Sequence, residues 1–297
     1  MSGPMIEVYR GSAQAWECDH MGHLNVRFYV KRAELALAGL FAELGIDGAL
    51  VTVEAQHHRF HREVRAGGAL YATAQIASMG ERDAQVMIRI LHSASDELSA
   101  SFGLRLSSSE PWPDASREGA ASITGPFDAA VLPRGLEPEE GADPEASRER
   151  AIALGMRATG RTIILPENCD ARGRLGLGAA MGLIADATPN MRSSEWREVL
   201  RQTAPGQPQR VGGALVEFSF HHRRWPMLGE RVEIWSGAVA CTDKVTKVAH
   251  WLIDPSSGDA LASVRTVGVS LDLDARRMIP LTPEAQAVFR REALAGF

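Results

Sequence analysis

The chain lacks the features that define several classes of protein. Its 297 residues include only three cysteines, Cys18, Cys169 and Cys241, which are too few and too scattered for a disulfide framework and lack zinc-type Cys-x-x-Cys spacing. No apolar run approaches the length of a membrane span, and the N-terminus lacks the pattern of a secretory signal. The formal net charge of -5 argues against general nucleic-acid binding. We therefore expect reduced thiols, a cytoplasmic location, and neither membrane nor nucleic acid as a partner.

Two copies of one pattern are found when the chain is compared with itself. At an offset of 151 residues, five residues recur in the same order: Arg10, Cys18, Asp19, Gly22 and Leu24 match Arg161, Cys169, Asp170, Gly173 and Leu175. Further along, the offset is 161 residues, so the second copy contains a ten-residue insertion; there His61, Arg62 and Gly68 match His222, Arg223 and Gly229. The repeat, the length and the apolar content of 45% predict two domains, at 1–108 and 151–297.

The segment between the copies, residues 109–150, has a different composition. It contains several prolines and glycines and the acidic run 137–140. Such a composition is typical of a connection rather than a core, and so long a connection is natural between two domains. We predict a linker that lies over the surface.

Periodic patterns predict one helix and several strands in each copy. Apolar side chains recur every three or four residues from Val26 to Leu44, with Gly45 as a stop, and the second copy has a shorter helix from Gly178 to Ala187 before Pro189, followed by a short helix at 193–200. The predicted strands are Leu50–Glu54, Gln56–Glu63, Leu70–Met79, Ala84–Ser93 and Leu98–Ser107, then Val211–Arg223, Arg231–Ala240, Lys244–Ile253 and Leu261–Leu271. A helix followed by an antiparallel meander is an α+β arrangement.

The segment before the first helix reads Asp19-x-x-Gly22-His23-x-Asn25. It places an acid, a glycine turn, an imidazole and a carboxamide beside the unpaired N–H groups of a helix N-terminus, where a carbonyl oxygen is polarised. This motif, followed by Tyr29, resembles that of 4-hydroxybenzoyl-CoA-type and acyl-ACP-type thioesterases of the hotdog fold. For two copies, the resemblance implies a double hotdog, with a central helix wrapped by an antiparallel sheet in each repeat.

The resemblance also implies hydrolysis of an acyl-CoA or acyl-ACP thioester. Asp19 would be the catalytic carboxylate, which either attacks the thioester or activates a water, with His23 and Asn25 assisting. Backbone N–H groups near Gly22 and His23 would stabilise the oxyanion, and Tyr29 would line the pocket wall. No metal and no cofactor beyond the CoA of the substrate would be needed. Without the motif, Asp19 is a turn former, and for Asn25 helix capping remains an equally good interpretation.

The second copy keeps Asp170 but has Arg174 and Gly176 where His23 and Asn25 stand, so we interpret it as degenerate. Arg174 would bind a phosphate or form a salt bridge, and a second active site at Asp170 stays open.

Two stretches of predicted strand, 57–65 and 221–224, are rich in histidine and arginine. Their arginines are candidate anchors for the phosphates of CoA. They are Arg59, Arg62 and Arg223, and the alternative is that strand alternation leaves them as ordinary surface charge. A metal site at His20 and His23, or at His57 and His61, is a weaker hypothesis, because no further ligands accompany either pair at suitable spacing.

Two other functions compete with thioester hydrolysis. A hotdog hydratase or dehydratase of enoyl-CoA is disfavoured because that class usually places its Asp and His one residue farther apart than Asp19 and His23. A non-catalytic acyl-CoA-binding protein is the other alternative. Exposed sheet edges, and the oligomerisation that the resemblance to this family implies, predict a homo-oligomer.

Overall fold

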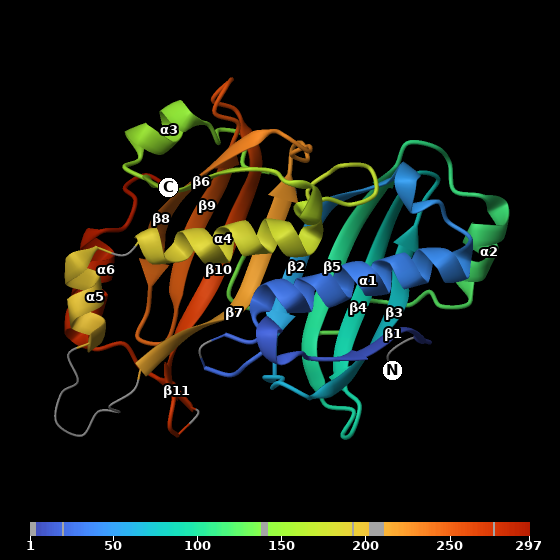
Figure 1. The fold of residues 1–297 in the computed structure, drawn as a ribbon, viewed down its shortest axis with the longest axis horizontal. Helices are drawn as coiled ribbons and strands as arrows, with labels where there is room; N and C mark the ends of the chain where they lie inside the picture. Colours follow the sequence, from blue (N-terminus) through green and yellow to red (C-terminus); the bar gives the residue numbers. More distant parts are fainter. Residues whose placement is uncertain (1–3, 20, 138–141, 192, 202–210, 276) are drawn as a thin grey trace. The chain divides into compact units, whose positions relative to one another are not determined.

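The computed structural model describes residues 4–19, 21–137, 142–191, 193–201, 211–275 and 277–297 (Figure 1). The chain forms two compact units, one of Met1–Arg134 with Pro166–Gly182 and one of Gly135–Leu165 with Leu183–Phe297. The predicted domain boundaries stay a prediction. His20 and residues 138–140 of the acidic run lie outside the described residues. Within the described part, no helix is both long and apolar enough to cross a bilayer.

Unit 1 is a helix lying across an antiparallel sheet. Its elements are β1 (Ile6–Ser12), η1 (Ala15–Glu17), α1 (Val26–Leu44), η2 (Gly48–Leu50), β2 (Val51–Phe60), β3 (Ala69–Met79), β4 (Asp83–His92), β5 (Leu98–Ser108) and α2 (Asp114–Ala121), with η3 (Pro166–Asn168) and the start of α4. The strand order is β1-β3-β4-β5-β2. Helix α1 packs on β1, β3 and β4, and its buried face includes Val30, Leu37 and Leu40.

Unit 2 repeats this plan. Its elements are α3 (Arg148–Ala153), β6 (Arg157–Ile163), the rest of α4 (Leu177–Met191), α5 (Ser194–Arg201), β7 (Val211–His222), β8 (Arg231–Cys241), β9 (Thr246–Ile253), β10 (Ala260–Asp272), β11 (Arg277–Ile279) and α6 (Pro283–Arg291). The strand order is β6-β8-β9-β10-β7, with β11 paired to β10. Strands β6 to β10 thus pair in the same order as β1 to β5, so the sequence repeat is also a repeat of topology.

The predicted elements agree with the structure except at a few places. The strands predicted at Leu50–Glu54 and Gln56–Glu63 are one strand, β2, with a register shift between Val53 and Ala55. Helix α4 continues through Pro189 to Met191, whereas the sequence predicted an end before this proline. A proline this close to the end of a helix removes a single hydrogen bond, which the helix tolerates. Strands β1, β6 and β11 and helices α2, α3 and α6 were not predicted.

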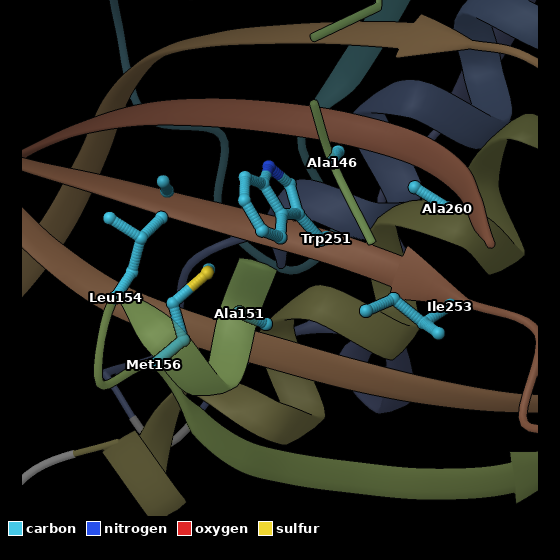
Figure 2. Close-up of a cluster of buried hydrophobic side chains, with 8 residues drawn as sticks. Ala146, Ala151, Leu154, Met156, Trp251, Ile253 and Ala260 are labelled. Carbon is cyan, nitrogen blue, oxygen red and sulfur yellow. The ribbon is translucent and has the colours of Figure 1, made fainter. Parts of the chain in front are cut away.

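The predicted linker contains ordered and buried structure. Trp112 is buried and donates from Nε1 to the carbonyl of Asp83 at 3.2 Å, and Ile123 and Val131 are also buried. At its other end, Ala146 packs with Leu154, Met156 and the indole of Trp251 in an apolar cluster on the sheet of unit 2 (Figure 2). Both ends of this segment therefore contribute to a core.

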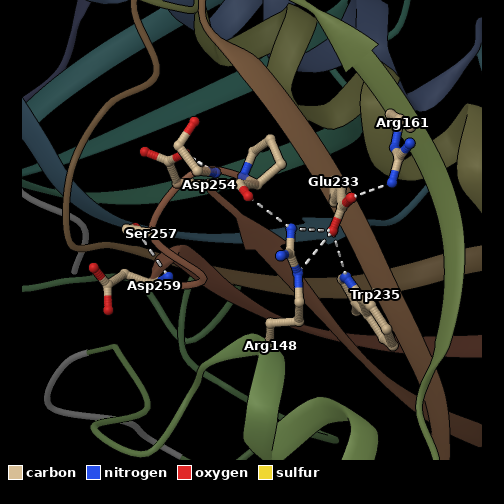
Figure 3. Close-up of polar contacts among 9 residues, drawn as sticks. Arg148, Arg161, Glu233, Trp235, Asp254, Ser257 and Asp259 are labelled. Carbon is tan, nitrogen blue, oxygen red and sulfur yellow. Dashed lines mark hydrogen bonds and ion pairs between the residues drawn. The ribbon is translucent and has the colours of Figure 1, made fainter.

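A buried carboxylate lies beside this cluster, on β8. Glu233 accepts hydrogen bonds from Arg148, Arg161 and the indole of Trp235 (Figure 3). Burial alone would raise the pKa of Glu233, but its three donors outweigh this effect and hold the pKa below its ordinary value. This ion cluster fixes the start of α3 to the sheet.

Candidate active site

The motif residues form a tight turn between η1 and α1. Oδ1 of Asp19 accepts hydrogen bonds from the backbone N–H groups of Met21 at 2.8 Å and His23 at 3.2 Å. Gly22 has a φ of 77°, a conformation that glycine adopts without steric cost. The N–H of Gly22 donates to the carbonyl of Asp19 at 2.9 Å, and the N–H of Asp19 to that of His23 at 2.8 Å. The turn therefore fixes the Asp19 carboxylate through one oxygen, while Oδ2 accepts no hydrogen bond from the described residues.

Helix α1 begins directly after this turn, with Asn25 as its N-cap. Oδ1 of Asn25 accepts from the N–H of Arg27 at 3.0 Å, so the capping interpretation of Asn25 is confirmed. The neighbouring amides donate to carbonyls elsewhere: Leu24 to Val64 and Asn25 to Glu17. The N–H of Val26 has no acceptor among the described residues. This amide lies in the first turn of a long helix, where the partial positive charge is greatest.

His23 is buried beside an acid that the sequence analysis did not single out. It is 8% exposed, and its Nε2 lies 3.0 Å from Oε2 of Glu63, which is partly exposed. In the sequence, Glu63 sits among arginines and histidines and looked like part of a basic strand. A comparison of the two copies contains a signal for this contact. Both residues of the pair are replaced by arginine in the second copy, His23 by Arg174 and Glu63 by Arg224.

Tyr29 lies on the buried face of α1. Its hydroxyl accepts from the N–H of Val64 at 2.9 Å and donates to the carbonyl of Arg62 at 3.4 Å. Burial raises the pKa of Tyr29, so the phenol is neutral at physiological pH. The hydroxyl ties α1 to the segment after β2, and its predicted place in a pocket wall stays a prediction.

The second motif has the same turn with a different partner for the acid. Oδ1 of Asp170 accepts from the N–H groups of Arg172 at 2.8 Å and Arg174 at 3.0 Å, and Gly173 has a φ of 72°. Here, however, Oδ2 accepts from Nε of Arg174 at 2.8 Å, and Nη1 of the same arginine donates to the carbonyl of Val51 at 2.9 Å. The two aspartates thus have the same backbone hydrogen bonds at Oδ1 and differ at Oδ2, which in Asp170 is neutralised by an arginine.

A further carboxylate faces the start of α4. Oε2 of Glu34, on α1, lies 3.4 Å from the N–H of Gly178. The helix N-terminus at the second motif is therefore already opposite a negative charge, which a developing oxyanion would repel. Both differences agree with the interpretation of the second copy as degenerate.

The arginines predicted to anchor phosphate all have protein partners. Arg59 donates to the carbonyls of Ala129 and Leu132, Arg62 pairs with Glu97, Arg174 with Asp170, and Arg223 donates to the carbonyls of Asp143 and Ala146. The structure assigns each of them a contact within the protein, and a role in binding substrate stays a prediction. Within the described residues, no group of three histidine, cysteine or acidic side chains is placed to hold a metal ion.

Residues 13–106 match the family model of the thioesterase-like superfamily. The matched segment contains the motif turn, α1 and strands β2 to β4, with most of β5. No curated protein matches the chain in sequence.

Several solved structures have the same fold over nearly the whole chain. A protein assigned as an oleoyl thioesterase from Lactobacillus plantarum has a TM-score of 0.64 at 10% identity, with 90% of this chain and 96% of that one covered. The 12:0-ACP thioesterase from Umbellularia californica has a TM-score of 0.62 at 11% identity, covering 90% and 97%. An acyl-ACP thioesterase from Bacteroides thetaiotaomicron has 0.61 at 7% identity, covering 89% and 97%.

The shared fold shows that the chain is of the α+β class with a double hotdog fold, and its residues 13–106 are similar to the thioesterase-like superfamily. The predicted resemblance and fold class are thereby confirmed.

Proposed function

We propose that the chain hydrolyses an acyl thioester of CoA or of acyl carrier protein to the free acid and the thiol, at the first motif. The observation that carries this proposal is the difference between the two aspartates. Oδ2 of Asp19 accepts no hydrogen bond from the described residues, whereas Oδ2 of Asp170 is bound by Arg174. A base or nucleophile needs an oxygen that no donor already holds, and of the two aspartates only Asp19 has such an Oδ2 among the described residues.

In the proposed reaction, Asp19 either attacks the thioester carbonyl or takes a proton from an attacking water. A thioester suits this simple apparatus, because its carbonyl is poorly stabilised by resonance and its thiolate leaves readily. The two hydrogen bonds to Oδ1 hold the carboxylate in one orientation, which lowers the cost of bringing Oδ2 to the carbonyl carbon. If Asp19 attacks, the thiolate leaves and a water then hydrolyses the mixed anhydride at Oδ2 to the free acid. If Asp19 acts as a base, the water adds to the carbonyl carbon and the thiolate leaves. On either route the proton held by Asp19 passes to the thiolate, which gives the thiol and restores the carboxylate.

The developing oxyanion needs a donor at the start of α1. The amides predicted for this role, those of Gly22 and His23, donate within the turn, to the carbonyl and Oδ1 of Asp19. We therefore assign the role to the N–H of Val26, which has no acceptor among the described residues and lies at the positive end of α1. His23, held by Glu63, and the amide nitrogen of Asn25 would orient the water or the carbonyl.

The cytoplasmic location and a homo-oligomeric state stay predictions that accompany this proposal.

Thiol release from short, medium, long and aromatic acyl-CoAs tests the function, with Asp19→Asn beside the wild type. We expect release by the wild type that falls by about 10²- to 10⁴-fold in the variant. Hydration of an enoyl-CoA is followed in parallel. Hydration without thiol release, or binding of acyl-CoA without either reaction, would contradict the proposal.

A further inference from the structure

A buried ion pair lies directly beneath the motif turn. Glu17 and Arg32 are each 5% exposed. Nη1 of Arg32 donates to Oε1 of Glu17 at 2.8 Å and Nη2 donates to Oε2, which also accepts from the N–H of Gln14 at 2.9 Å. Nη2 further donates to the carbonyl of Ser12 at 3.0 Å. The pair therefore joins β1, η1 and the second turn of α1.

The pair is connected to Asp19 through the backbone of the turn. The carbonyl of Glu17 accepts from the N–H of Asn25 at 2.9 Å, and the next residue, Cys18, forms a β-bridge with Leu24. Asp19 follows at once, hydrogen-bonded to His23. A shift of Glu17 relative to α1 therefore also moves Asp19, through these two backbone hydrogen bonds and the β-bridge between them.

The second copy shows that the turn folds without this ion pair. At the offset of 151 residues, Asn168 replaces Glu17 and Leu183 replaces Arg32. The carbonyl of Asn168 still accepts from the N–H of Gly176, at 2.8 Å, and Asp170 still has both backbone hydrogen bonds at Oδ1. The turn therefore needs the backbone contacts but not the two charges.

Burying two charges is a poor way to gain stability. The desolvation of a buried ion pair usually offsets its attraction, and apolar or neutral replacements are often neutral for stability or better. Here Nε of Arg32 also has no hydrogen-bond partner among the described residues, which adds a cost. The pair occurs in the copy that keeps the acid, the histidine and the asparagine of the motif, and is lost in the copy that does not.

We propose that Glu17 and Arg32 are positioning residues for Asp19. This inference rests on the proposed function of the first motif. The bidentate contact fixes the turn on α1, so that the carboxylate and the helix N-terminus keep one relative geometry during the reaction. A misplacement of about 1 Å at such a site lowers a rate by up to about 100-fold.

The test transfers the residues of the second copy into the first, as the double variant Glu17→Asn, Arg32→Leu. We expect kcat to fall by about 10- to 100-fold while KM stays within about threefold, because the lost effect is one of geometry in the transition state. The melting temperature should stay equal or rise. The matched control is Glu7→Asn, Arg10→Leu, which removes an exposed bidentate pair on β1 and should leave kcat unchanged.

Hydrogen–deuterium exchange gives a readout that does not depend on turnover. In the double variant, the amides of Met21, His23 and Asn25 should exchange faster, and those of β4 and β5 should not. Arg32→Lys, which keeps the charge and loses the bidentate contact, should give an intermediate kcat.

An unchanged kcat in the double variant, or unchanged exchange at the three amides, would overturn the proposal. A double variant that no longer folds would also overturn it, because the pair would then serve the fold. If the wild type releases no thiol from any acyl-CoA, the proposed function fails, and the exchange rates still decide whether the pair holds the turn.

Discussion

Stability at acidic pH should depend strongly on one histidine of unit 2. His250, on β9, is 2% exposed. Its Nδ1 forms a hydrogen bond of 2.8 Å with Oγ of Ser236, which in turn bonds Oγ1 of Thr159 at 2.8 Å. On the other side, Nε2 lies 3.5 Å from Oγ1 of Thr266. These partners satisfy a neutral imidazole, and no acid among them stabilises an imidazolium.

Burial lowers the pKa of His250 from 6.5 to about 3. Between these values the unfolded chain binds a proton that the folded chain does not, so the free energy of unfolding falls as the pH falls. The contribution is complete above pH 6.5 and lost as the pH approaches 3. At about 1.4 kcal/mol per pH unit, the whole shift corresponds to about 5 kcal/mol, of which about 3 kcal/mol is lost between pH 6.5 and 4.

Urea denaturation of the wild type and of His250→Asn at pH 7.5, 6.5, 5.5, 4.5 and 4.0 measures the contribution of His250 to the free energy of unfolding. The asparagine keeps a polar group near Ser236 but does not titrate. Burial also lowers the pKa values of His58 and His222, so both proteins should lose stability in acid, and the difference between them isolates His250. We expect the wild type to lose about 3 kcal/mol more than the variant between pH 6.5 and 4. Equal losses would refute the reasoning.

Four further substitutions test packing and the two turns. Trp251→Ala should cost about 3–5 kcal/mol in the free energy of unfolding, because the indole is fully buried in the apolar cluster of unit 2, and a cost below 1 kcal/mol would contradict this packing. Gly22→Ala and Gly173→Ala should each lower the free energy of unfolding by about 1–3 kcal/mol, because alanine is strained at a positive φ, but only Gly22→Ala should also lower thiol release. Equal losses of activity would contradict the assignment of the active site to the first motif. Arg174→Ala should lower the melting temperature and leave KM for acyl-CoA unchanged, since the guanidinium binds Asp170; a KM raised several-fold would instead indicate a phosphate contact.

The helix, the repeat and the motif could be predicted because each depends on local signals. The period of α1, its asparagine cap and its glycine stop fix both of its ends, and the predicted range Val26–Leu44 is the observed one. The five-residue match at an offset of 151 predicted a duplicated unit, and the strands of the two units pair in the same order.

The elements that were missed depend on partners distant in sequence. Strands β1 and β6 are short and have no clear alternation, and they form because β3 and β8 offer an edge. The short helices of the connecting segment hold their places by packing, as Ala151 does against the sheet of unit 2. Pro189 shows that a strong local signal can be overridden near the end of a helix.

Within the candidate site, the sequence predicted the residue types but not their partners. Nothing in the motif shows that Glu63 would meet His23, or that Arg32 would meet Glu17 fifteen positions earlier. A comparison of the two copies gives the missing signal, because the partners of the first turn are replaced together in the second.

The rates of thiol release by Asp19→Asn and Asp170→Asn decide whether the proposed site at Asp19 is the working one. Both variants remove one carboxylate from the same kind of turn and keep a side chain that accepts the same backbone hydrogen bonds. We predict a loss of at least about 100-fold for Asp19→Asn and nearly full activity for Asp170→Asn. Equal losses in the two variants, or a larger loss for Asp170→Asn, would contradict the account.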